Sequence, residues 1–323
     1  MKQKEFNPFL FYSAQLQDML LKAKKQSNPA LWLYKNNVRT TLFMLEALTR
    51  LHNKAFDEKL FSKWNKRFKK LEDLFGELDQ FIVLENQLKK NKKVSKEILK
   101  YFSVHSTNIL NKCNRRLTEK EWFNNKLESF DNKLSEFDVE YNQEYLNELK
   151  YVVEDEVDSI YLFCEKVNFQ FTKLEEEVHE LRRKLRWLSI YAQALNGLIQ
   201  LKKIKSNAKY KINYFNKEIL NSPYNQLPKK PKNTIIIEYN SEAFFALSWI
   251  INELGKLKDN GINLQMLSDA IYIVENLNRI EAEEKSISLL ALHKGINEEI
   301  LRNASSIMKT YLTEDKLLDA LII

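Results

Sequence analysis

Residues 31–50 read LWLYKNNVRTTLFMLEALTR, and the apolar side chains in this stretch recur every three or four positions. The apolar positions are Leu31, Tyr34, Val38, Leu42, Leu45 and Leu48. This spacing places one stripe of side chains along one face of a helix, so the stretch predicts a long amphipathic helix with a buried face. The same spacing returns at Phe68, Leu71, Leu74, Leu78 and Ile82.

The composition points to the same fold class. The chain of 323 residues contains only five glycines and five prolines, about a quarter of ordinary usage. A fold rich in strands and tight turns needs more of both residue types. We therefore expect an all-α protein, and a chain of this length can bury a core without disulfides or metals.

The helical pattern extends over most of the chain and is interrupted once. The predicted helices cover 9–25, 29–52, 56–90, 95–112, 118–134, 138–170, 172–205, 241–258, 262–278, 281–292, 296–309 and 313–322. Asn28 before Pro29, Asp57 and Ser95 are the expected N-caps. Residues 206–240 hold three of the five prolines and end in a β-branched run at 235–237, so a connecting excursion with one short extended piece is expected there.

The remaining bulk features exclude several classes of protein. The two cysteines, Cys113 and Cys164, form no CxxC pair and have no histidine at ligand spacing, so neither a disulfide framework nor a structural zinc site is expected. No stretch approaches the roughly 18 charge-free apolar residues of a membrane span. We expect a cytoplasmic protein with no cofactor, no metal and no membrane partner. The 51 basic and 44 acidic side chains give a net charge of only +7, so the clustering of charge matters more than its total.

Two segments of the sequence resemble each other. Residues 31–50 and 174–193 both open a helical pattern with a polar residue three positions before an arginine. The polar and basic residues concerned are Asn36 with Arg39, and His179 with Arg182. Such an echo indicates two related helical halves, here 1–170 and 171–323, within a single unit that covers 1–323.

A lone glycine between apolar neighbours follows each arginine. Gly76 lies 37 positions after Arg39, and Gly255 lies 73 positions after Arg182. Removing the excursion of about 35 residues leaves about 38, so the two halves keep one register. A glycine inside a helix costs up to about 1 kcal/mol relative to alanine, and its recurrence predicts a close helix crossing in both halves. Chance similarity between amphipathic helices is the alternative.

These motifs resemble the CHAD family, the conserved-histidine α-helical domain. His179, Arg182 and Arg186 fall where the family has its histidine and successive basic residues, and Leu254 to Asp259 is similar to its second glycine motif. The first half departs from the pattern in two places. Asn36 replaces the histidine, with Phe43, Met44 and Glu46 at positions that are usually basic, and Asp79 with Gln80 follow Gly76. The resemblance implies two pseudo-symmetric antiparallel helical bundles that bind inorganic polyphosphate in a basic groove between them.

The second motif suits a polyanion on physical grounds as well. His179, Arg182, Arg183 and Arg186 follow the i, i+3, i+4, i+7 rule and share one helix face, while Lys184 is expected to point elsewhere. Guanidinium groups stay charged and grip phosphate oxygens with two hydrogen bonds. In the first half, Lys35, Asn36 and Arg39 are the candidate binding residues, with Lys35 and Arg39 as an i, i+4 pair.

Other interpretations of the same residues stay open. The arginine row is also typical of a solvated helix face with salt bridges from Glu175 to Arg182 or from Glu176 to Arg183. The acidic stretch 140–158 is expected to be the outer face of one helix and not a metal site. No motif of a catalytic site is present, so the protein is not expected to be an enzyme. A helical scaffold for protein partners is the alternative function, and nucleic-acid binding is not expected because carboxylates dilute the basic residues.

Overall fold

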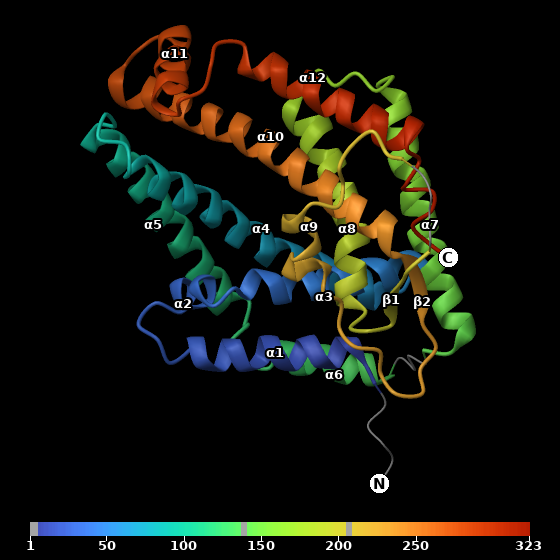
Figure 1. Cartoon of the computed structure of the whole chain (residues 1–323). Helices are drawn as coiled ribbons and strands as arrows, with labels where there is room; N and C mark the ends of the chain where they lie inside the picture. Colours follow the sequence, from blue (N-terminus) through green and yellow to red (C-terminus); the bar gives the residue numbers. More distant parts are fainter. Residues whose placement is uncertain (1–5, 137–140, 205–208) are drawn as a thin grey trace.

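The computed structural model describes residues 6–136, 141–204 and 209–323 and confirms the all-helical class (Figure 1). The first helices are α1 (Pro8–Ala23), α2 (Pro29–Lys35), α3 (Val38–Phe56), α4 (Lys59–Leu88), α5 (Lys96–Glu119), α6 (Lys126–Glu136) and α7 (Gln143–Lys166). A π-helical turn, η1 (Leu174–His179), then leads into α8 (Glu180–Ala194). After strand β1 (Ile199–Lys202) come α9 (Lys217–Leu220), the 3-10 turn η2 (Pro223–Asn225), strand β2 (Ile237–Asn240), α10 (Ser241–Glu275), α11 (Arg279–Leu289), α12 (Ile296–Lys309) and the π-helical turn η3 (Thr310–Glu314).

Helix starts follow the predicted caps with one exception. The side chains of Asn28 and Ser95 accept hydrogen bonds from the backbone of the first turns of α2 and α5, as expected. The prediction for Asp57 was wrong, because this residue ends α3 in the left-handed conformation and Glu58 precedes α4. Asparagine and aspartate tolerate positive φ better than other non-glycine residues, which suits Asp57 to a helix end.

Several predicted helix boundaries differ from the observed ones. The boundary between the predicted helices 95–112 and 118–134 was wrong, because α5 continues to Glu119 and α6 begins at Lys126. The predicted helix 29–52 is broken into α2 and α3, because Asn37 takes a φ of 57°. The predicted helices 241–258 and 262–278 are one helix, α10. Gly261 lies inside α10, where a side chain would collide with Leu174. The glycine therefore serves packing and does not end the helix.

The predicted helices 172–205 and 313–322 were also partly or wholly wrong. Helix α8 ends at Ala194, and the chain continues as β1, which pairs in parallel with β2. The residues after η3 form no helix, and Ile322 pairs with Tyr239 instead. The limits predicted at 138 and 205 lie outside the described residues. The expected extended piece at 235–237 corresponds to the start of β2.

The core joins both halves of the sequence. One apolar cluster runs from Phe9 on α1 to Leu321 near the C-terminus. A second cluster joins the ends of α4 and α5 to α10 and α11, and Phe102 and Leu267 both belong to it. Helix α3 packs against both α4 and α8. The α3–α4 pair and the α8–α10 pair therefore face each other between these two packed regions (Figure 1).

Candidate functional site: an arginine-lined cleft

A large cleft lies between the α3–α4 pair and the α8–α10 pair, with a volume of about 1210 Å³. Residues 218–224, around α9 and η2, supply part of its wall through Glu218, Ile219, Ser222 and Tyr224. Figure 1 shows α9 in front of α3 and α8. The excursion predicted from its prolines thus takes part in forming the cleft.

Five of the seven predicted binding residues line this cleft, namely Arg39, His179, Arg182, Arg183 and Arg186. Lys35 and Asn36 do not belong to its lining, and both side chains are exposed. The helix break at Asn37 is the physical reason, because it takes Lys35 out of register with Arg39. The predicted i, i+4 pair between these two residues was therefore wrong.

Each glycine of the internal echo lies next to an arginine side chain. A Cβ added at Gly76 would lie 2.8 Å from Nη2 of Arg39, and one added at Gly255 would lie 2.9 Å from both Nε and Nη2 of Arg182. Each glycine thus leaves room for the guanidinium that its facing helix carries. The expected close approach of a facing helix is present at both glycines, and in each case an arginine side chain occupies the space that a Cβ would fill.

The Arg39 guanidinium is neutralised by carboxylates from α4. Its Nε donates a hydrogen bond to Oε1 of Glu72 at 2.5 Å, and its Nη1 lies 3.3 Å from Oδ2 of Asp79. Tyr34 donates a further hydrogen bond to Asp79 at 2.9 Å. Glu72 is only 5% exposed. Arg39 is therefore largely committed to pairs within the protein.

Arg182 has a different environment although it occupies the same kind of position. Its Nε donates to the backbone carbonyl of Ile251 at 3.0 Å, and no carboxylate in the described part of the chain forms a salt bridge with it. Lys258 stands three positions after Gly255, as Asp79 does after Gly76, and it pairs with Asp259 at 2.6 Å. Arg182 therefore has no salt bridge among the described residues. Burial lowers its pKa, and the charge of Asp259, which is paired with Lys258, opposes this shift.

Arg186 lies over an aromatic ring instead of pairing with a carboxylate of the described residues. Its guanidinium lies 4.8 Å from the ring centroid of Phe43, and the Arg39 guanidinium lies 5.2 Å from the same centroid. Within the described ranges no side chain forms a hydrogen bond or ion pair with Arg186. Burial, together with the charges of Arg182 and Arg39, lowers its pKa to about 10, and the charge of Glu72 opposes this shift. Arg186 thus carries a buried positive charge without a hydrogen-bonded carboxylate among the described residues.

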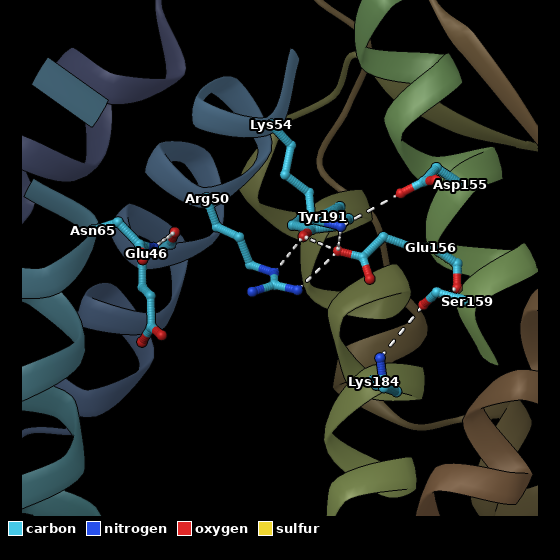
Figure 2. Close-up of polar contacts among 9 residues, drawn as sticks. All are labelled: Glu46, Arg50, Lys54, Asn65, Asp155, Glu156, Ser159, Lys184 and Tyr191. Atoms are coloured by element: carbon cyan, nitrogen blue, oxygen red, sulfur yellow. Dashed lines mark hydrogen bonds and ion pairs between the residues drawn. The ribbon is translucent and has the colours of Figure 1, made fainter. Parts of the chain in front are cut away.

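The other predicted residues are paired. Arg183 forms a salt bridge with Glu180 at 2.6 Å, and Nδ1 of His179 lies 2.6 Å from Oε2 of Glu175. Neither salt bridge considered from the sequence, from Glu175 to Arg182 or from Glu176 to Arg183, forms between these described residues. Lys184 was expected to point elsewhere, and its ammonium group is directed toward Ser159 at 3.5 Å (Figure 2) and toward the Phe163 ring on α7, although the residue borders the cleft.

Acidic side chains share the lining of the cleft. Eight lysines and arginines and eight carboxylates contribute to it. Five of the carboxylates come from the α3–α4 side, and they are Glu46, Glu72, Asp73, Glu77 and Asp79. The predicted groove is therefore basic along α8 and mainly acidic along α4. No pattern in the sequence indicates that these carboxylates face the arginines, because the pairing depends on how the helices pack.

A buried ionic network lies at the end of the cleft nearest α7 (Figure 2). Nη2 of Arg50 donates to Oε1 of Glu156 at 2.9 Å, and Lys54 lies 3.0 Å from the same oxygen. Nε of Arg50 donates to the hydroxyl of Tyr191 at 2.9 Å. Burial would raise the pKa of Glu156, but Arg50 and Lys54 outweigh it and lower that pKa. Glu156 is 1% exposed, so the expectation that residues 140–158 form an outer face was wrong at this position.

Comparisons with known proteins give no relative for this chain, because no family model, no curated protein and no solved structure matches it. The resemblance to the CHAD family therefore stays a prediction. Among residues 6–136, 141–204 and 209–323, no group of histidine, cysteine, aspartate or glutamate side chains is placed to hold a metal ion. No helix within those ranges is long and apolar enough to cross a membrane.

Proposed function

We propose that the cleft binds inorganic polyphosphate or a similar phosphate-rich anion, without chemistry, through Arg182 and Arg186. The observation that carries this proposal is the pair of guanidinium groups on one face of α8, which lack a carboxylate partner among the described residues. Unpaired charges in a partly desolvated site favour an anion that restores the missing interactions. Arg39 adds a third positive charge nearby but is already paired.

Arginine suits this task better than lysine. Its planar guanidinium presents a fixed fork of donors that matches two oxygens of one phosphate. Arg182 is oriented by its hydrogen bond to Ile251, and Arg186 is oriented by the Phe43 ring. Groups held in place before binding lose less conformational entropy when the ligand arrives.

The acidic side of the cleft restricts how a polyphosphate chain can lie. Glu72, Asp73 and Glu77 on α4 would repel phosphates that run along that helix. A bound chain therefore keeps to the α8 side, where Arg182, Arg183 and Arg186 follow one another. We expect short chains of a few phosphates to occupy the site fully.

Calorimetry with tripolyphosphate at two salt concentrations tests this proposal. We expect the Arg182→Gln/Arg186→Gln variant to lose most of the binding and much of its salt dependence, because fewer counterions are exchanged. The matched control is Arg67→Gln/Lys126→Gln. It also removes two positive charges, from side chains that lie over Trp64 and Trp122 outside the cleft.

The outcomes separate the site from general attraction by positive charge. Loss of binding in the cleft variant with retention in the control supports the proposal. Equal loss in both variants contradicts it, because the anion would then respond to overall charge. If the wild type does not bind tripolyphosphate at low salt, the alternative of a helical scaffold for a protein partner takes its place.

A further inference from the structure

Glu46 is a buried acid with one carboxyl oxygen that no described residue satisfies. It lies on α3, lines the cleft and is 3% exposed. Its Oε2 atom is buried and has no hydrogen-bond partner within the described part of the chain. Buried polar atoms in native proteins are nearly always hydrogen-bonded. An unsatisfied carboxyl oxygen on a cleft wall is therefore a candidate for ligand binding.

The cations around Glu46 are engaged elsewhere. Lys69 forms a salt bridge with Asp73 at 2.7 Å. Arg50 points away from Glu46 toward Glu156 and Tyr191 in Figure 2. The side-chain amide of Asn65 donates to the backbone carbonyl of Glu46 and to the hydroxyl of Thr49, and not to the Glu46 carboxyl. The side chain thus has no cationic partner of its own.

The electrostatic surroundings of Glu46 favour an incoming cation over an anion. Burial raises its pKa to about 8, and of the charges that face it Glu72 and Asp73 raise the pKa while Lys69 and Arg50 lower it. The neighbouring carboxylates that hinder ionisation of Glu46 also attract a positive charge. An anion placed here would meet Glu72, whereas an ammonium group would meet two or three carboxylates.

Glu46 and the arginine pair line the same cleft. Glu46 follows Phe43 by three positions, which corresponds to a rise of about 4.5 Å along α3. The Phe43 ring carries the Arg186 guanidinium at 4.8 Å. The charge of Glu72 raises the pKa of both Glu46 and Arg186, so Glu72 is within electrostatic range of both side chains. A short organic molecule can therefore reach both groups.

We infer that the ligand of the cleft is an organic phosphate that also carries a protonated primary amine, with its phosphate on Arg182 and Arg186 and its amine on Glu46 and Glu72. This inference rests on the proposed function, because it takes the arginine pair as the phosphate subsite. It narrows the ligand from phosphate-rich anions in general to molecules with both charges. The basic side of the cleft would then bind the phosphate, and the acidic side would bind the amine.

Two probes that differ by the amine test the inference. We expect the wild type to bind phosphoethanolamine about tenfold more tightly than ethyl phosphate, since one additional charge-assisted contact is formed. In Glu46→Gln this preference falls to about one. The matched control Glu77→Gln removes an exposed carboxylate from the same side of the cleft and keeps the preference.

The proton balance gives a second readout that a loss of packing would not produce. An ammonium group on Glu46 makes the neutral acid ionise, so phosphoethanolamine binding at pH 7 releases a proton from this residue. Titration in two buffers of different ionisation enthalpy measures that proton, which should be absent in Glu46→Gln.

The possible results distinguish the two proposals. Equal affinity for the two probes in the wild type, or a preference that survives in Glu46→Gln, overturns the inference. Binding of tripolyphosphate without binding of phosphoethanolamine also overturns it and leaves the proposed function standing. If no phosphate probe binds, the proposed function fails and the inference fails with it.

Discussion

Alanine at the two echoed glycines is expected to give different results, although both substitutions create the same collision. In each variant the new Cβ must displace an arginine side chain that now lies within 2.9 Å of its position. The helix gains up to about 1 kcal/mol in either case, because alanine is the better helix former. The two variants differ in the interaction that the displaced arginine loses.

Gly76→Ala moves Arg39 away from Glu72, whose carboxylate is nearly buried. A buried charged acceptor without its partner costs roughly 1–3 kcal/mol, so we expect a net loss of about 1–2 kcal/mol of stability. Gly255→Ala removes only the hydrogen bond from Arg182 to Ile251, worth about 1 kcal/mol, and should leave stability nearly unchanged. The displaced guanidinium should weaken tripolyphosphate binding by roughly three- to tenfold.

Urea unfolding monitored by circular dichroism measures both free energies of unfolding. The double variant Gly76→Ala/Glu72→Gln serves as the control. If the unpaired carboxylate causes the loss, adding Gly76→Ala to Glu72→Gln should cost much less than adding it to the wild type. Equal destabilisation by Gly76→Ala and Gly255→Ala would refute this reasoning, because both glycines would then serve helix packing alone.

Three further predictions concern buried groups that titrate. Burial lowers the pKa of His52 to about 3 from an ordinary 6.5. Its neutral ring therefore contributes stability above pH 6.5 that is lost as the pH falls toward 3. Below pH 6.5 the free energy of unfolding should drop by up to about 1.4 kcal/mol per pH unit more in the wild type than in His52→Phe. Burial raises the pKa of Glu46 to about 8 from 4.5, so its stability contribution is full below pH 4.5 and lost as the pH rises to 8. Chemical unfolding at pH 5 and pH 8 should therefore show Glu46→Gln gaining on the wild type at the higher pH, and an unchanged difference would contradict the burial of this acid. Glu156→Gln leaves Arg50 without a carboxylate and Lys54 with Asp155 alone. We expect it to lower the free energy of unfolding at pH 7 by roughly 2–4 kcal/mol, less than for a fully buried pair because both cations are partly exposed. A loss below about 1 kcal/mol in urea unfolding would contradict the network.

The sequence predicted features that depend on local spacing. The helical class, the caps at Asn28 and Ser95, and the presence of Arg182 and Arg186 on one helix face all follow from residues within a few turns of each other. The recurrence of Gly76 and Gly255 could also be recognised, since both glycines face an arginine that the same echo contains.

Features that depend on packing between distant segments were not predicted. The break at Asn37 depends on a single left-handed residue, and β1 was taken for the end of a helix because its pairing strand lies 38 positions away. The partners of Arg50 and the acidic side of the cleft are set by helices that meet only in the folded chain. Glu156 stands 106 positions from Arg50, and no periodicity links them.

Location of a heavy anion in crystals of the protein tests the central claim most directly. Crystals soaked in tungstate, a tetrahedral dianion, would be measured at the tungsten absorption edge. The account predicts the main anomalous peak in the cleft, within hydrogen-bond distance of the guanidinium groups of both Arg182 and Arg186. A cleft without a peak, with tungstate bound instead at the surface around Arg67 and Lys126, would contradict it.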